Sequence, residues 1–339
     1  MNKDNLPAGF TTRGATMDDI APAVELYNLW SQAVLREDEF SETEPVREEW
    51  TSPGFEPEND IRLVFAPDGT MVGYIEVWTT TKPPVHPWVW GRVHPEYSNQ
   101  GIGTYLLNWA EKRAAQALPE LPTNARFAPR MGIPQNAKEA CLLAEEMGYK
   151  NIRGSFDMWI GMDTPPPKPK WAEGIRMETY SAKIGLEVIY KTYVETFGDH
   201  FGFVESPFEE GLQNFRHFML EADDFDPTLW FIAIDGDEVV GVCLCRPKSF
   251  EIPEAGYVHV MGVRRNWRHR GLGLAFLQHA FGEFYRRGTT KVTLGVDAEN
   301  LTGALGLYEK AGMHVYKQVI LYEKEIRAGK EISVQSIQE

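Results

Sequence analysis

A glycine-rich segment beside a run of arginines has the most recognisable chemistry in this sequence. Gly271 and Gly273 follow a basic cluster within seven residues, made up of Arg264, Arg265, Arg268 and Arg270. An apolar strand pattern at 257–263 leads into the segment. An amphipathic helix pattern follows it, with apolar residues at Leu274, Leu277, Phe281 and Phe284. A glycine turn that opens a helix presents unpaired backbone N–H groups and a positive dipole end to one point. We therefore predict a phosphate-binding loop, in which both glycines allow close backbone approach and the arginines add charge-assisted bonds.

Two common phosphate loops do not fit this segment. Residues 272–277 read L-G-L-A-F-L, so the Lys-Ser/Thr pair of a Walker loop is missing. The third glycine of a dinucleotide fingerprint is missing as well. From these residues alone, a solvated loop at a helix end remains the alternative.

The chain is an internal repeat divided by a proline-rich spacer. Residues 163–170 contain four prolines, which favour an extended linker, and they separate residues 1–162 from 171–326. The interval from Val93 to Gly103 equals that from Val263 to Gly273, and each half then has an asparagine twelve positions before a glycine. We expect two domains of the same fold, with a polar tail at 327–339.

Each half predicts the same order of elements. In the first half we expect a helix at 20–34 and strands at 62–65, 71–78 and 88–93. In the second half we expect helices at 185–197 and 301–311 and strands at 229–234, 238–245, 257–263, 291–296 and 315–326. The pattern predicts an α/β fold with a mixed sheet, present twice.

Composition narrows the function classes. The 34 basic and 49 acidic residues give a net charge of -15, which disfavours nucleic acid as a partner. No apolar stretch is long enough to cross a membrane, and the N-terminus lacks an export signal. Cys141, Cys243 and Cys245 are too few for a disulfide framework or a structural zinc site, so we expect no metal and a cytoplasmic location.

The motif R-x-x-G-x-G at 268–273 resembles the acyl-coenzyme A pyrophosphate loop of the GNAT acetyltransferases. Val263 before the loop, Asn300 after the next strand, and Tyr308 eight positions later match further landmarks of that family. The resemblance covers nearly all of each half, and the tandem layout is similar to that of the mycothiol synthases. It implies two domains, each with a mixed sheet flanked by helices, and acetyl transfer from acetyl-CoA to the primary amine of a small molecule. It also implies these cofactor contacts: Met261, Gly262, Val263, Arg268, His269, Arg270, Gly271, Leu272, Gly273, Leu274 and Asn300.

The resemblance assigns Tyr308 as the general acid that protonates the departing thiolate. A phenol has a pKa near ~10 and a thiol near ~8.5, which suits this role. By strand alternation His259 shares a face with Tyr257, Met261 and Val263, and it is either the general base, through one water, or a satisfied core histidine. Because neither Cys243 nor Cys245 lies on the loop strand, we expect direct attack by the amine without a covalent intermediate. Residues 198–210 combine acidic and aromatic side chains, which suits either an acceptor wall for a cationic amine or a solvated surface loop.

The first half lacks both chemical groups. Ser98 stands where the loop arginine would be, and Ala144 matches Tyr308. We therefore expect the second half to be catalytic and the first half to be mainly structural. A non-catalytic acyl-CoA binding module is the alternative for the whole chain, and both a monomer and a homodimer fit the sequence.

Overall fold

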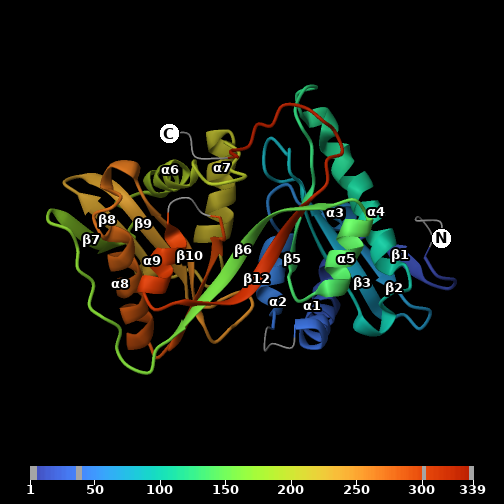
Figure 1. Ribbon diagram of the computed structural model, residues 1–339, viewed down its shortest axis with the longest axis horizontal. Coiled ribbons are helices and arrows are strands. Elements are labelled where there is room, and N and C mark those ends of the chain that lie inside the picture. Colours follow the sequence, from blue (N-terminus) through green and yellow to red (C-terminus); the bar gives the residue numbers. More distant parts are fainter. Residues whose placement is uncertain (1–5, 36–39, 300–302, 336–339) are drawn as a thin grey trace. The chain divides into compact units, whose positions relative to one another are not determined.

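The computed structural model describes residues 6–35, 40–299 and 303–335. The chain forms two compact units. The first comprises Met1–Arg153 and Val319–Ile332, and the second comprises Gly154–Gln318 and Ser333–Glu339. Each unit is a mixed sheet with helices on its faces, as the sequence predicted (Figure 1).

The first unit has the strand order β1-β2-β3-β4-β5-β12. Its neighbouring strands are antiparallel except for β4 and β5, which are parallel. Its strands are β1 (Thr11–Arg13), β2 (Ile61–Phe65), β3 (Met71–Trp78), β4 (Trp88–Val93), β5 (Arg130–Pro134) and the end of β12 (His314–Glu323). Its helices are α1 (Ile20–Trp30), α2 (Thr43–Trp50), α3 (Pro57–Asp60), α4 (Ile102–Ala114) and α5 (Lys138–Glu146).

The second unit repeats this plan in the order β7-β8-β9-β10-β11-β6, and only β10 and β11 are parallel. Its strands are β7 (Ile175–Thr179), β8 (Trp230–Asp235), β9 (Glu238–Arg246), β10 (Gly256–Val263), β11 (Lys291–Asp297) and most of β6 (Lys150–Gly161). Its helices are α6 (Leu186–Phe197), α7 (Phe208–Phe215), α8 (Leu272–Arg286) and α9 (Ala304–Lys310).

The compact units differ from the two sequence repeats because the last strands are exchanged. Residues 155–161 of β6 belong to the first repeat, yet they pair with β11 of the second unit. Residues 319–323 of β12 belong to the second repeat, yet they pair with β5 of the first unit. The expected break at 163–170 therefore separates the repeats but not the compact units.

Two apolar layers enclose the sheet of the second unit. Residues of α6 and α7 pack on one face with Trp230, Ile232 and Leu244. Residues of α8 and α9 pack on the other face with Phe231 and Cys243, as Figure 1 shows for the two pairs of helices. Because both faces are covered, β8 and β9 are almost continuously apolar and buried.

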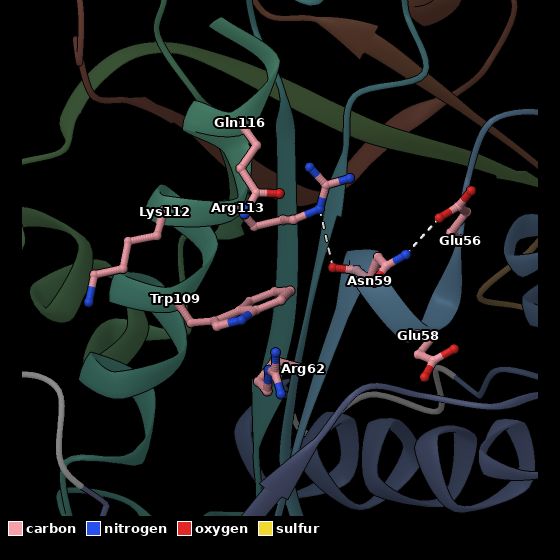
Figure 2. A pocket seen from close by; sticks show the side chains of 8 residues that line it. All are labelled: Glu56, Glu58, Asn59, Arg62, Trp109, Lys112, Arg113 and Gln116. Atoms are coloured by element: carbon pink, nitrogen blue, oxygen red, sulfur yellow. Dashed lines mark hydrogen bonds between the residues drawn. The ribbon is translucent and has the colours of Figure 1, made fainter.

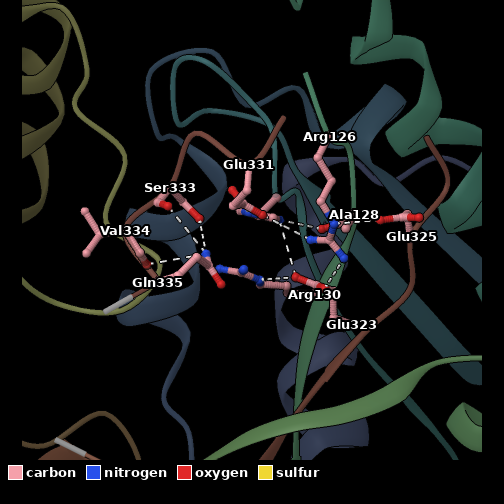
Figure 3. A network of polar contacts seen from close by, with 10 residues as sticks. Arg126, Ala128, Arg130, Glu323, Glu325, Glu331, Ser333, Val334 and Gln335 are labelled. Carbon is pink, nitrogen blue, oxygen red and sulfur yellow. Dashed lines mark hydrogen bonds and ion pairs between the residues drawn. The ribbon is translucent and has the colours of Figure 1, made fainter. Parts of the chain in front are cut away.

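The C-terminal segment is bonded to the first unit. Arg126 pairs with Glu323 at 2.6 Å, with Glu325 at 2.7 Å and with Glu331 at 3.1 Å (Figure 3). Its backbone also pairs with the 124–130 segment, for example through the Arg126 N–H, which donates to the carbonyl of Lys330. The polar tail expected at 327–339 is thus bonded to the first unit through Lys330 and Glu331, and Glu331 neutralises part of the charge of the half-buried Arg126.

Candidate active site

The glycine-rich loops of the two halves have the same backbone conformation. The φ angle is 61° at Asn99 and 85° at Gly101 in the first loop, and 61° at His269 and 82° at Gly271 in the second. The two glycines are the N-caps of α4 and α8, and the left-handed conformation at these positions favours glycine. Both helices begin with N–H groups that have no intrahelical partner. The backbone requirement for binding phosphate is therefore met twice.

The second glycine of each loop has a packing role. A Cβ on Gly273 would lie 2.8 Å from Cδ2 of Leu307 in α9, and one on Gly103 would lie 2.7 Å from Cδ2 of Leu143 in α5. A Cβ on Gly271 would meet nothing within 4 Å. The missing Cβ at Gly273 therefore makes room for α9, a packing role that the sequence analysis did not predict.

β10 and β11 diverge soon after they begin. Among the described residues they pair only at Gly256 with Val292 and at Tyr257 with Thr293, although both strands continue for several residues. β4 and β5 are likewise paired at a single position. Backbone groups beyond Tyr257 on this edge of β10 thus have no partners from β11, and they are free to bond an amide-bearing ligand.

A β-bulge in β10 decides which side chains share a face. The register against β9 shifts between Val258 and Val260, and these residues pack into apolar clusters on opposite faces of the sheet. Met261 and Val263 pack with Val258 on the face of α8 and α9. The alternation that placed His259 with Met261 and Val263 is therefore wrong, because it ignores the extra residue of the bulge. The register between β3 and β4 runs without a shift.

His259 lies in an aromatic group at the bulge. Its ring is 5.4 Å from that of Tyr257 and 5.7 Å from that of Phe250. Its Nδ1 is enclosed and has no hydrogen-bond partner among the described residues. Burial, helped by the nearby Arg246, lowers the pKa of His259 to about 4. At neutral pH the ring is therefore uncharged, and it is a weak base.

Tyr308 lies in α9 and is buried in the apolar layer between the helices and the sheet. Its hydroxyl has no hydrogen-bond partner among the described residues. Burial, with a smaller effect from Cys243, raises the pKa of Tyr308 to about 12, so the phenol stays protonated at neutral pH. The matching Ala144 of α5 is fully buried. Both residues occupy the same place in their units, but only the second unit has a proton donor there.

Local carboxylates neutralise most of the basic cluster. Arg264 pairs with Glu195 at 2.7 Å and also with Glu238. Arg265 and Arg268 share Asp199, to which the Arg265 Nε donates at 3.0 Å.

Arg268 donates to two backbone carbonyls beside the loop. Its Nε donates to the carbonyl of Val263 at 3.0 Å, and one of its terminal nitrogens donates to the carbonyl of Thr196 at 3.4 Å. Arg270 is exposed and pairs with no residue that the structure describes. The sequence therefore overstated the positive charge available to a phosphate, since three of the four arginines have acidic partners.

The structure brings most of the expected cofactor residues to one place. Met261, Gly262 and Val263 end β10, and the loop and first turn of α8 follow directly with Arg268, His269, Arg270, Gly271, Leu272, Gly273 and Leu274. A Cβ on Gly262 would lie 2.6 Å from Cβ of Thr196, so this glycine lets α6 approach the strand. Asn300 lies outside the described residues.

Two side chains of the expected acceptor wall at 198–210 contact other residues of the protein. Asp199 is engaged by arginines, so its charge is not available to a cationic amine. Phe208 packs on Tyr190 and lies under the ammonium of Lys191, 5.3 Å from the ring centroid.

Sequence reasoning missed a buried polar group in the first unit. Glu76 of β3 accepts hydrogen bonds from the indole N–H groups of Trp50 at 2.9 Å and Trp78 at 3.0 Å. Burial raises its pKa to about 7. On the neighbouring strand, the guanidinium of Arg92 lies over Trp30 at 4.1 Å and over Trp90 at 4.5 Å. The glutamate within the apolar run of residues 71–78 was the signal available in the sequence.

One polar pocket lies away from these groups. It has a volume of about 440 Å³ and lies between α3, β2 and α4, where Arg62 stacks on Trp109 (Figure 2). It contains none of the predicted site residues. No group of three or more metal-ligating side chains occurs among the residues that the structure describes.

Comparison with known proteins decides the family. The acetyltransferase (GNAT) family matches residues 23–132 and 186–313, which is one region in each half and more than half of the chain. The chain belongs to the GNAT acetyltransferase family. It is an acyltransferase that uses acetyl-CoA as co-substrate and an amine as acceptor, as the loop motif predicted.

Individual relatives agree with the tandem layout. The mycothiol acetyltransferase of Salinispora arenicola is 28% identical over 271 residues, which are 77% of this chain and 80% of the relative. The solved GCN5-related N-acetyltransferase from Sphaerobacter thermophilus is 34% identical, with a TM-score of 0.82, and the match covers 98% of this acetyltransferase and 100% of that chain. A tandem GNAT protein from the clavulanic acid biosynthesis pathway shares the fold, with a TM-score of 0.69 at 14% identity over 95% of this chain and 100% of that one. In the described part of the acetyltransferase, no helix is both long and apolar enough to span a bilayer.

Proposed function

We propose that the second half of this acetyltransferase contains the working site and that the first half does not transfer acetyl groups. The observation that supports this most directly is the pair Tyr308 and Ala144. The glycine loops of the two halves have the same backbone conformation, so both halves can bind a phosphate group. At the matching position of the later helix, only the second half has a buried hydroxyl. A second difference between the halves also supports a working site in the second half. The pairing of β10 with β9 contains a bulge, whereas the pairing of β4 with β3 has no register shift.

The proposed reaction is direct attack of a neutral amine on the thioester carbonyl. A carbon–nitrogen bond forms and the carbon–sulfur bond breaks. The attacking amine releases its proton to water, and the departing thiolate takes a proton from water. Backbone N–H groups at Met261 and Val263 stabilise the oxyanion. Since the pKa of Tyr308 is about 12 and that of a thiol is near ~8.5, Tyr308 acts chiefly as a hydrogen-bond donor to the departing sulfur.

His259 has a limited role in this scheme. A ring with a pKa of about 4 does not keep a proton taken from an ammonium group. We propose that the acceptor enters as a neutral amine and that the unpartnered Nδ1 accepts a hydrogen bond from it. This orients the nitrogen lone pair towards the thioester.

The acceptor that we propose is a small molecule with a primary amine. Mycothiol acetyltransferases are among the relatives, which supports a small-molecule acceptor. The three cysteines are free thiols, which supports a reducing, cytoplasmic environment.

The location of the site can be tested with matched variants of the two loops. Gly271→Asp and Gly101→Asp each add a carboxylate at an N-cap where a Cβ meets nothing within 4 Å. We expect Gly271→Asp to weaken coenzyme A binding at one site by more than about tenfold, because the new charge repels the pyrophosphate. Acetyl-CoA-dependent thiol release with a panel of primary amines should also be lost. Isothermal titration and a thiol assay measure the two effects.

Gly101→Asp is the control, and it should leave turnover unchanged. Turnover that survives Gly271→Asp and disappears in Gly101→Asp would move the active site to the first half. Gly271→Asn, which keeps the shape without the charge, separates backbone strain from repulsion.

A further inference from the structure

Val334, in the C-terminal segment, contacts the short loop that follows α6. The Gly202 N–H donates to the carbonyl of Val334 at 2.7 Å, and the Val334 N–H donates to the carbonyl of Phe203 at 2.9 Å. These two bonds bracket the peptide between Gly202 and Phe203. Ser333, the residue before this contact, is buried. The segment is therefore fixed to the loop by main-chain bonds, which do not depend on side-chain identity.

The same loop and the last turn of α6 also contact the candidate cofactor loop. Asp199 accepts hydrogen bonds from Arg265 and Arg268, and the carbonyl of Thr196 accepts another from Arg268. His200 is influenced electrostatically by Arg268 and by Asp297. Residues 196–203 thus lie where β10 and β11 end, beside the glycine loop.

This loop is made of turns, in which the His200 N–H donates to the carbonyl of Phe197 at 2.8 Å and the Phe203 N–H donates to the carbonyl of His200 at 3.1 Å. Residues 198–203 form no helix or strand, and Gly202 has a φ of 78°. Holding such a segment in one conformation costs entropy, and the bonds to Val334 offset part of that cost.

We propose that residues 333–335 are a positioning segment of the cofactor site in the second half. By fixing the peptide at 202–203, they keep Asp199 and the carbonyl of Thr196 against the arginines of the glycine loop, and so they hold that loop in its anion-binding form. The proposal rests on the proposed function, in which acetyl-CoA binds to the second half.

The test uses Val334→Pro, which removes the N–H donated to Phe203, and Val334→Ala, which keeps it. We expect Val334→Pro to raise the Kd of coenzyme A about three- to tenfold, the range for losing one or two main-chain bonds. The KM for acetyl-CoA should rise by the same factor, while kcat at saturation stays within about twofold. Val334→Ala should behave as wild type.

A merely structural segment would lower the melting temperature without this split between KM and kcat. Equal coenzyme A affinity in Val334→Pro and wild type overturns the proposal. Absence of binding at the Gly271-dependent site in wild type overturns the proposed function instead.

Hydrogen exchange on the wild-type protein gives a second test that needs no variant. Adding coenzyme A should slow exchange in peptides covering 198–203 and 333–335 together with those of the glycine loop. Protection confined to the glycine loop would contradict the proposal.

Discussion

At the scale of single residues, the site depends on two groups whose pKa values burial moves in opposite directions. Burial raises the pKa of Tyr308 to about 12 and lowers that of His259 to about 4. Both groups are consequently neutral from about pH 5 to pH 11, so a break in kcat/KM between pH 6 and 9 reports a different group, such as the acceptor amine itself. The neutral phenol is a donor and the neutral imidazole an acceptor, which is the pairing that the proposed attack requires.

Tyr308→Phe tests the donor. We expect kcat to fall about 100-fold, the scale for losing one hydrogen-bond donor to charge that develops in the transition state, while the Kd of acetyl-CoA changes less than about twofold. The hydroxyl has no hydrogen-bond partner among the described residues, so the melting temperature should stay close to that of wild type. Stopped-flow turnover and isothermal titration measure the two constants. An unchanged kcat would show that the sulfur leaves without help from Tyr308.

At the scale of elements, the glycine loop of the second half shows that a cluster of arginines in the sequence need not leave an equal positive charge available to a ligand. The basic cluster contains four arginines, yet Glu195, Glu238 and Asp199 lie against three of them. What remains for a phosphate is the backbone N–H groups, the helix dipole and Arg270.

Arg270→Ala should therefore weaken coenzyme A binding about three- to tenfold at low salt, and by less at high salt, because an exposed charge is screened. Arg264→Ala removes an equal charge that already has carboxylate partners. We expect it to change the affinity by less than about twofold. Titrations at two salt concentrations provide the comparison, and a larger effect for Arg264→Ala would show that its pairs open on binding.

At the scale of the whole molecule, strand exchange makes each sequence repeat incomplete. Residues 155–161 supply the strand beside β11, and residues 319–323 supply the strand beside β5. A fragment that begins at the proline-rich spacer lacks the first of these strands, although it contains every motif of the candidate site.

We expect the fragment 163–339 to show no cooperative thermal unfolding and no turnover when it is expressed alone. The control is the full chain with a protease site inserted in 163–170. After cleavage its two pieces should stay together in gel filtration and keep their activity, because each provides a strand to the other's unit. Separation of the pieces, with activity in the second alone, would contradict this organisation.

Local patterns in the sequence determined the elements and their order. The apolar runs at 71–78 and 88–93 match β3 and β4 residue for residue, and the glycine spacing correctly placed both loops at helix starts. The repeat and the R-x-x-G-x-G motif identified the family, because motif chemistry depends on residues close together in the chain. The candidate positions of Tyr308 and Gly271 were available for the same reason.

Only the tertiary structure decided what depends on residues far apart in the chain. The bulge at Val258 and Val260 is a register shift against β9, and single-strand alternation does not contain it. The pairing of Asp199 with the loop arginines, the packing of Leu307 on Gly273 and the exchange of β6 and β12 each join segments that are tens of residues apart or more. Sequence spacing therefore fixed which residues could do the chemistry, while packing and charge pairing fixed which of them are free to do it.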